Sequence, residues 1–345
     1  MRQINDGIVF SNDIYRILKG KNALNFSYLD NGMEIPDKKD IEFLRQDFKN
    51  DVNRIFNNKV EIIEEDEMEK YVYETLEDTE NLPIVSLDKI YINEQSNINN
   101  DLYFLDCTRV EGSKELVPRK EKDAIAVSKQ IENISGVLKK KDKKDIILFD
   151  DVVFSGSVLR KIIEQFKQND VDVIGIRACV STEESYKYFN ENLKKGLKCG
   201  CLLGKDVIDQ ICERDFYFGI VQSGISVRSS EGICKAPYFK PYGNPIKRAS
   251  IPKKFEIVFS NNCLLRSMYL WKKIEDKTGR NIYVKDLPER IVHTRKDDRL
   301  LDVLRKGMIY DEKVTDRDNG FCRWFKLQWW CINVCKKSWR ISCKI

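Results

Sequence analysis

The stretch Ile146–Val158, with the sequence IILFDDVVFSGSV, decides the fold that we expect for this chain. Its first four residues form a short, continuous apolar run, which predicts a strand buried in a parallel sheet. Apolar residues at helical spacing follow from Val158 to Phe166 and predict a helix. Two carboxylates therefore stand where a strand leaves the sheet, and a Ser-Gly-Ser loop stands at a helix N-terminus. In open α/β sheets, ligands bind at this kind of place.

The loop Phe154–Ser157 has the composition of a phosphate-binding turn. Its backbone N–H groups, together with the positive end of the following helix, can surround a phosphate. Gly156 lets the backbone approach a ligand without an intervening Cβ, and the hydroxyls of Ser155 and Ser157 add donors. The acidic pair before the loop supplies acceptors for vicinal sugar hydroxyls or a hydrated metal ion. The alternative is an ordinary strand-turn-helix connection whose acids face solvent or cap the helix.

The segment resembles the motif with which type I phosphoribosyltransferases bind phosphoribosyl pyrophosphate (PRPP). That motif consists of an apolar strand, an acidic pair, further apolar residues and T/S-G-T/S, matched here by Asp150-Asp151 and Phe154-Ser155-Gly156-Ser157. The resemblance implies that the acidic pair orients the ribose hydroxyls and that the loop holds the 5′-phosphate. It also implies Mg²⁺ as cofactor, held by Asp150 and Asp151 through water or the ribose.

A second strand end is expected at Leu102–Asp106, before a turn that contains Arg109, Gly112 and Ser113. An arginine can bind two oxygens of a pyrophosphate at once, and Gly112 and Ser113 can offer backbone N–H groups. In phosphoribosyltransferases a loop after an early strand binds the pyrophosphate, and these three residues resemble that loop. An ordinary surface turn is the alternative.

The segment between this turn and the central strand departs from the family pattern. Family members that catalyse transfer usually carry a hairpin with a long mobile loop here, whereas residues 113–145 predict a loop, one helix and a basic linker. Such a loop excludes water and completes the site, so without it the sequence does not decide whether the protein catalyses transfer. Either residues 114–122 cover the site or the site closes in a different way.

Strands and helices continue to alternate beyond the central helix. An apolar run over 172–180 predicts a second parallel strand with a right-handed crossover, and Ser181-x-x-Glu184 predicts a capping box at the next helix. Further helices are expected over 41–56, 68–76, 121–138 and 206–212, and further strands over 83–87, 89–92, 198–203, 216–221 and 255–259. The sequence therefore predicts an α/β fold with a mainly parallel sheet flanked by helices and preceded by a helical region.

Asn261 and Asn262 follow the last of these expected strands and precede a helix that carries Trp271. Some phosphoribosyltransferase-like proteins of bacterial conflict systems, including retron-linked ones, have an Asn-Asn pair before a tryptophan-bearing helix. The resemblance implies that the two amides line the acceptor side of the pocket, where they could recognise a base edge. Capping of the helix by Asn262 is the alternative.

Three regions are expected along the chain. Residues 1–80 form an N-terminal helical cap region, residues 81–285 the phosphoribosyltransferase-like α/β domain, and residues 286–345 a C-terminal extension. The last 24 residues hold four of the five tryptophans and four of the eleven cysteines. The extension is therefore expected to be disordered or non-native, and no function is built on it.

The composition excludes several classes of protein. A hydrophobic fraction of 42% and a charged fraction of 33% are typical of a globular protein. A net charge of +5 does not indicate a protein that binds nucleic acid. The sequence contains no apolar run long enough for a membrane span and no apolar signal region. An odd number of cysteines without an export signal indicates reduced thiols and a cytoplasmic location. With a single histidine and no CxxC pair, a structural zinc site is not expected.

The leading hypothesis is an enzyme that binds PRPP with Mg²⁺ and transfers ribose 5-phosphate to a nitrogen nucleophile. Asp150, Asp151 and Arg109 would then carry the catalytic roles. The alternative is a regulatory module that senses PRPP or a nucleotide without catalysis, and release of pyrophosphate would distinguish the two. A protein partner in a defence system is expected from the family analogy alone, as is a third option of nucleic-acid association, which salt-dependent binding would reveal.

Overall fold

The structure is a computed structural model that describes residues 1–20, 26–79, 81–92, 101–113, 115–119, 125–230 and 232–309. The tryptophan- and cysteine-rich end of the chain lies outside the described residues. So do the polar loop over 93–100 and residues 114 and 120–122 of the segment that was expected to cover the site.

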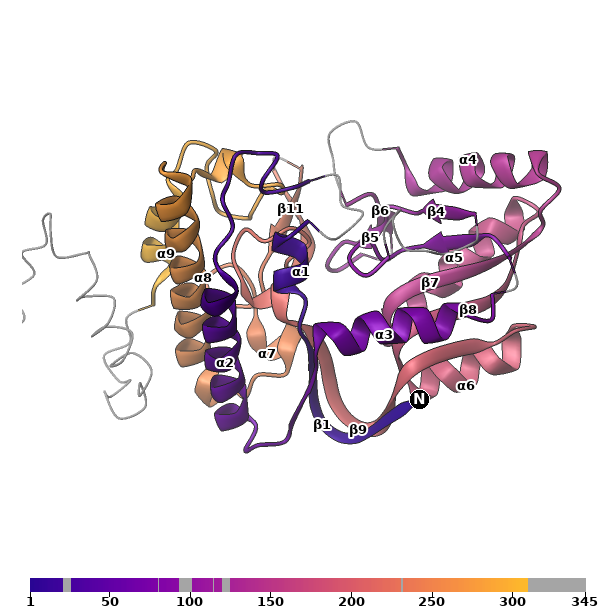
Figure 1. The fold of residues 1–345 in the computed structure, drawn as a ribbon, viewed down its shortest axis with the longest axis horizontal. Helices are drawn as coiled ribbons and strands as arrows, with labels where there is room; N and C mark the ends of the chain where they lie inside the picture. The colour runs from indigo at the N-terminus through magenta and orange to yellow at the C-terminus, as the bar shows by residue number, and fades with distance from the viewer. Residues whose placement is uncertain are drawn as a thin grey trace, which may run out of the picture.

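A seven-stranded parallel sheet forms the centre of the protein, with the strand order β2-β1-β9-β8-β7-β3-β4 (Figure 1). The prediction of an α/β fold with a mainly parallel sheet is confirmed. The strands of this sheet are β1 (Arg2–Ser11), β2 (Val60–Ile63), β3 (Ile84–Ser86), β4 (Leu102–Phe104), β7 (Asp145–Val153), β8 (Asp172–Thr182) and β9 (Leu197–Cys212).

Helices cover both faces of the sheet. On one face lie α4 (Val127–Lys140), α5 (Ser157–Gln168) and α6 (Glu183–Asn192), and on the other lies α3 (Glu65–Leu76). Side chains of β7 alternate between the two cores, since Ile146 and Leu148 pack with α4 and α5 whereas Ile147 and Phe149 pack into the other core. The same alternation sends the next two side chains, both aspartates, to different faces.

A helical lobe packs beside the carboxyl ends of the strands and occupies the left half of Figure 1. Its core is continuous with the face of the sheet that α3 covers. It contains α1 (Ile14–Leu18), α2 (Lys38–Ile55), α7 (Pro245–Ala249), α8 (Glu256–Thr278) and α9 (Leu300–Gly307), with the 3-10 turns η1 (Glu213–Phe216), η2 (Lys253–Phe255) and η3 (Val284–Asp286). Two antiparallel hairpins complete the fold, β5 (Thr108–Arg109) with β6 (Leu116–Val117), and β10 (Ile225–Ser229) with β11 (Gly232–Ala236).

Strands β1 and β9 connect the sheet to the helical lobe, and Figure 1 shows them curving together from one to the other. The first part of β9 pairs with β8, and the strand pairs with β1 from Cys201 to Cys212 through two register shifts. Gly7 lies at one of these shifts with a φ of +84°, where an added Cβ would lie 2.7 Å from the carbonyl oxygen of Lys59. The ends of β1 and β9 therefore deliver polar residues to the junction between sheet and lobe.

Several predicted elements are corrected by the structure. The first eighty residues are not mainly a helical cap, because β1 and β2 belong to the central sheet, although the helices α2 and α3 were expected. The helix expected over 206–212 is the second half of β9, where pairing with β1 overrides local pattern. Strands expected over 216–221 and 255–259 are instead turns and the start of α8, and 89–92 is a turn.

The boundaries of two expected helices also differ from the sequence pattern. The helix expected over 121–138 begins at Val127 in the described part. The predicted capping box at Ser181 is displaced by one residue, because the hydroxyl of Thr182 accepts the N–H of Ser185 at 3.2 Å. None of the helices in the described ranges has the length and apolar character needed to cross a bilayer.

Glu213, the first residue of η1, is fully buried where the sheet meets α2. Its carboxylate lies 3.4 Å from Nε of Arg45, and Arg45 also donates a hydrogen bond to Glu65 at 3.1 Å. Burial raises the pKa of Glu213 to about 7, and the nearby Arg45 charge only partly opposes this. A carboxyl that keeps its proton in the folded state makes the stability of the protein dependent on pH.

We expect the parent protein to lose about 3 kcal/mol of stability relative to Glu213→Gln as the pH rises from about 4.5 to about 7. In this window the unfolded chain has released the proton of Glu213 whereas the folded chain still holds it, so stability falls as pH rises. Urea unfolding of both proteins at several pH values measures the difference. Glu65→Gln, which removes the more exposed partner of Arg45, is the control, and parallel curves for parent and Glu213→Gln would contradict the prediction.

Candidate functional site

A cavity of about 280 Å³ lies between the carboxyl end of β7 and the helical lobe. It brings together residues from three separate parts of the sequence: the β5 strand, the β7–α5 connection and the segment that follows η1. The lining residues are Thr108, Arg109, Asp150, Val152, Val153, Phe154, Ser155, Gly156, Ser157, Val158, Leu159, Gly224, Ile225 and Tyr238. Six of the residues predicted from the sequence, Arg109, Asp150 and all four loop residues, therefore share one cavity.

The loop before α5 is held in place from the side of α6. The carbonyl oxygen of Phe154 accepts hydrogen bonds from the hydroxyls of Thr182 and Ser185, both at 2.7 Å. The hydroxyls of Ser155 and Ser157 lie 3.1 Å apart at the rim of the cavity. The first N–H groups of a helix have no carbonyl partner within it, so the N-terminus of α5 offers donors to an anion in this cavity.

Gly156 is required for a reason that the sequence did not show. It has a φ of +63°, in the left-handed region, and it is the residue directly before α5. An added Cβ would lie 2.7 Å from a ring carbon of Phe189 and 3.4 Å from the hydroxyl oxygen of Ser185, both in α6. The missing Cβ therefore makes room for the packing of the loop against α6, where the sequence suggested only close approach to a ligand.

Asp150 lines the cavity beside the loop. Its Oδ1 accepts the N–H of Asp151 at 3.1 Å, which fixes the orientation of the carboxyl group. Burial, followed by the negative charge of Asp151, raises the pKa of Asp150 well above the usual range, while Arg119 opposes the rise. Asp150 therefore keeps its proton to a higher pH than an ordinary aspartate.

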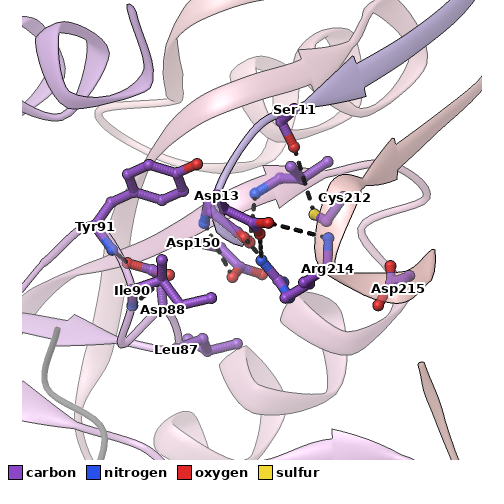
Figure 2. Close-up of polar contacts among 12 residues, drawn as sticks. Ser11, Asp13, Leu87, Asp88, Ile90, Tyr91, Asp150, Cys212, Arg214 and Asp215 are labelled. Atoms are coloured by element: carbon purple, nitrogen blue, oxygen red, sulfur yellow. Dashed lines mark hydrogen bonds and ion pairs between the residues drawn. The ribbon is translucent and has the colours of Figure 1, made fainter. Parts of the chain in front are cut away.

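Asp151 does not line the cavity and instead faces an arginine from the end of β9. Its Oδ2 lies 3.5 Å from Nη2 of Arg214. The same guanidinium donates to the carboxylate of Asp13, which also accepts the backbone N–H of Arg214 at 3.1 Å. Figure 2 shows Asp13, Arg214 and Asp150 converging at the ends of their strands. Sequence analysis missed Asp13 and Arg214 because no local motif marks them.

A fourth carboxylate, Asp88, stands in the turn after β3. Its two oxygens accept the backbone N–H groups of Ile90, Tyr91 and Ile92 at 2.7–3.0 Å (Figure 2). Burial, followed by the charge of Asp151, raises the pKa of Asp88 to about 6. The expected strand over 89–92 was wrong because this side chain draws the backbone into a turn. The sequence feature that could have indicated this turn is an aspartate shortly after a short apolar strand.

A hairpin does connect the early strands to α4, contrary to the prediction of a loop without one. Arg109 in β5 is exposed and lines the cavity, and among the described residues it has no ion-pair partner. Gly112 and Ser113 form the tip of the hairpin and are not among the lining residues. The hairpin is anchored to the helical lobe, since the N–H of Glu111 donates to Ser226 at 2.8 Å and its carboxylate accepts from Arg248.

The far wall of the cavity comes from the irregular, proline-rich segment after η1. Gly224, Ile225 and Tyr238 line it, and Asp215 supports two of them from behind. The carboxylate of Asp215 accepts the N–H of Gly224 at 2.8 Å, and its carbonyl oxygen accepts the N–H of Tyr238 at 2.9 Å.

Asn261 and Asn262 do not reach the cavity, and their expected role in binding the acceptor is corrected. Both lie inside the 23-residue helix α8. Asn261 exchanges hydrogen bonds with the backbone of Ile309 at 2.8 and 3.0 Å, whereas Asn262 is buried and donates to Asp51 at 3.0 Å. The expected capping role of Asn262 is also wrong, because the helix begins at Glu256.

Comparisons with known proteins add little to this geometry. No protein-family model matches the chain, and no curated protein matches its sequence. One solved structure with some similarity is a hypoxanthine phosphoribosyltransferase from Staphylococcus aureus, at 15% identity over 55% of this chain and 84% of that chain. The TM-score of this match is 0.21, so the similarity carries no argument about fold or function.

Proposed function

We propose that this chain binds PRPP with Mg²⁺ and transfers its ribose 5-phosphate group to a nitrogen nucleophile. One observation carries the proposal: a single cavity joins the N-terminus of α5, the carboxyl group of Asp150 and Arg109, which has no ion-pair partner among the described residues. These are the groups that a phosphate, a ribose and a second anionic group require. The matching order of motif elements in the sequence supports the same ligand.

Each end of the ligand has a partner in the cavity. The N-terminus of α5 and the hydroxyls of Ser155 and Ser157 bind the 5′-phosphate. Asp150 accepts hydrogen bonds from the ribose hydroxyls after it loses its proton. Arg109 binds the pyrophosphate, because its guanidinium faces the same cavity and offers two donors in one plane.

The residues present fit a magnesium ion that arrives with the ligand. Among the described residues, no group of three or more histidine, cysteine or acidic side chains is arranged to hold a metal by itself. Mg²⁺ is usually held by one or two carboxylates together with substrate oxygens and water, and Asp150 provides such a carboxylate. When bound, the ion would neutralise charge on the pyrophosphate.

The proposed reaction replaces one bond at C1 of the ribose. The bond from C1 to the pyrophosphate oxygen breaks, and the oxygen keeps the electron pair. A bond from C1 to the acceptor nitrogen forms, and that nitrogen releases a proton to water. The protein contributes by positioning both anionic ends and by stabilising the leaving group. Tyr238 and Ile225 on the far wall favour a flat, partly apolar acceptor.

The alternative of a PRPP or nucleotide sensor is favoured by the hairpin. In the part of the chain that the structure describes, the β5–β6 hairpin is short and fixed to the helical lobe by Glu111, without the long loop that closes over PRPP in the family resembled by this chain. A site that binds without closing would hold its ligand but would not exclude water. A role in a bacterial defence system, with a protein partner, stays a prediction.

Calorimetric titration of PRPP with Mg²⁺, combined with a pyrophosphate assay on the same sample, tests the proposal. We expect saturable binding that weakens when Mg²⁺ is removed, and release of pyrophosphate once a nucleobase or amine acceptor is added. Binding without release under any acceptor selects the sensor. Absence of binding rejects both functions.

The control for this experiment is Asp170→Asn. Asp170 follows α5 at the end opposite to the cavity, and its exposed carboxylate pairs with Lys139 at 2.9 Å. The Asp170→Asn substitution therefore removes one carboxylate from the same strand-helix-strand unit without changing the cavity. Its affinity for PRPP should equal that of the parent.

A further inference from the structure

We infer that Arg214 is a positioning residue that holds Asp151 at the edge of the proposed PRPP site, and that Asp13 anchors Arg214 for this task. This inference deepens the proposed function and rests on it for its binding consequences. The contacts that carry it come from the ends of β1, β7 and β9, which are remote from one another in the sequence.

Four carboxylates gather where the strands meet the helical lobe. Asp13, Asp88, Asp150 and Asp151 are close enough for their charges to influence one another. Carboxylates placed together repel one another and need a compensating cation. Among the described residues, Arg214 is the sole cation in ion-pair contact with Asp151, and it reaches Asp13 at the same time.

The orientation of Arg214 is fixed by its surroundings. Its side chain is 12% exposed, and its main partner Asp13 is fully buried. Asp13 accepts from both the guanidinium and the backbone N–H of Arg214, so neither the side chain nor the backbone can turn away easily. The remaining end of the guanidinium points to Asp151, where it has a looser contact at 3.5 Å.

This arrangement gives Arg214 a function beyond packing. Asp151 comes from the last part of β7, next to the carboxyl that lines the cavity, and an unpaired Asp151 would repel that neighbour. The alternation of β7 already turns the two adjacent side chains to different faces, and Arg214 fixes Asp151 on its own face by holding it toward β9, so that Asp150 stays directed to the ligand. The orientation of Asp151 therefore depends on residues that follow β1 and β9, although neither strand contributes a residue to the lining of the cavity.

Four variants test the inference. Arg214→Met removes the charge with similar bulk, Arg214→Lys restores the charge, and Asp13→Asn weakens the anchor. Arg45→Met is the matched control, since Arg45 pairs with Glu213, the neighbour of Arg214 in η1, and does not contact the acidic cluster at the cavity. All variants are made in the full chain, and their folding is checked by circular dichroism.

The first readout needs no ligand. Carboxyl carbon NMR detects Asp151, whose signal is assigned by its disappearance in Asp151→Asn. We expect this signal to move in Arg214→Met, to move less in Asp13→Asn, and to stay in place in Arg45→Met. An unchanged Asp151 signal in Arg214→Met overturns the inference. If Arg214→Met does not fold, an unchanged signal in Asp13→Asn overturns it.

The second readout is PRPP affinity in the presence of Mg²⁺. We expect binding about tenfold weaker in Arg214→Met, within threefold of the parent in Arg214→Lys, and unchanged in Arg45→Met. Equal losses in all three variants would show a merely structural role and overturn the inference. If the parent itself does not bind PRPP, the proposed function fails, while the NMR result still decides whether Arg214 positions Asp151.

Discussion

In calorimetric titrations, the Asp150→Asn variant is expected to bind PRPP ten to about a hundredfold more weakly than the parent protein. Asparagine has the same shape as aspartate but lacks its charge, and its N–H₂ group is a donor where the ribose hydroxyls and Mg²⁺ need an acceptor. Asp150 lines the cavity, so the loss falls directly on the ligand. The fold should be retained, because removing a carboxyl whose pKa is raised by burial relieves a cost of the folded state.

The pH dependence of binding sharpens this prediction. Because the pKa of Asp150 is raised, the group carries a proton at pH values where an ordinary aspartate is charged. The proposed contacts of Asp150 with the ligand require its charged form, so the affinity of the parent should rise with pH until Asp150 is ionised in the free protein. Asp150→Asn should lack this rise. Equal affinities for variant and parent across the pH range would place the ligand elsewhere.

Replacement of Gly156 by alanine is expected to lower the stability of the protein by about 2–4 kcal/mol and to abolish PRPP binding. The left-handed φ of +63° is unfavourable for alanine, and the new Cβ would lie 2.7 Å from the buried ring of Phe189. To relieve this contact, either α6 or the phosphate loop must move. Because the loop is tied to α6 through Phe154, its geometry changes in either case.

Gly136→Ala is the matched control for this substitution. Gly136 lies within α4, and an added Cβ there would meet no atom within 4 Å. Alanine should therefore stabilise the protein by up to about 1 kcal/mol through helix propensity, with no change in PRPP affinity. Guanidinium unfolding measures both variants. If Gly156→Ala loses binding but keeps the parent stability, the glycine serves the ligand and not the packing against α6.

The two predictions separate the two halves of the motif. Under the proposed function, Asp150 contacts the ligand from a position that the fold tolerates changing, whereas Gly156 supports the packing of the loop against α6. Asp150→Asn should therefore weaken PRPP binding without lowering the stability of the protein. A substitution at the glycine should change affinity and stability together, so measurements of both quantities on both variants distinguish chemistry from packing.

The sequence by itself determined the central strand, the loop and α5. Their signals are local: a continuous apolar run, a turn-forming Ser-Gly-Ser and apolar residues at helical spacing, all within some twenty residues. Because the carboxyl end of a parallel strand is where α/β proteins bind ligands, the same local pattern also placed Asp150 and Ser155–Ser157 at a cavity. Arg109 was predicted to lie there because it follows the end of the strand expected at Leu102–Asp106.

Local pattern failed where distant pairing decided the structure. Residues 206–212 follow no strand pattern strong enough to be recognised, yet they pair with β1 along the sheet. Phe255–Phe259 has the apolar content of a strand but begins α8, and this placed the Asn261-Asn262 pair inside a helix and far from its expected role. The strand or helix propensity of a five-residue segment is weaker than the tertiary contacts that decide its structure.

Only the tertiary structure showed which residues hold the acidic pair in place. Arg214 and Asp13 lie 201 positions apart, and neither belongs to a motif, so no spacing in the sequence joins them to Asp151. The order of the strands brings their ends to one edge of the sheet, where buried charges must find partners or be excluded. The sequence thus specified the carboxyl and the loop that line one side of the cavity, because these follow one strand, whereas charge compensation behind them depends on how seven strands are arranged.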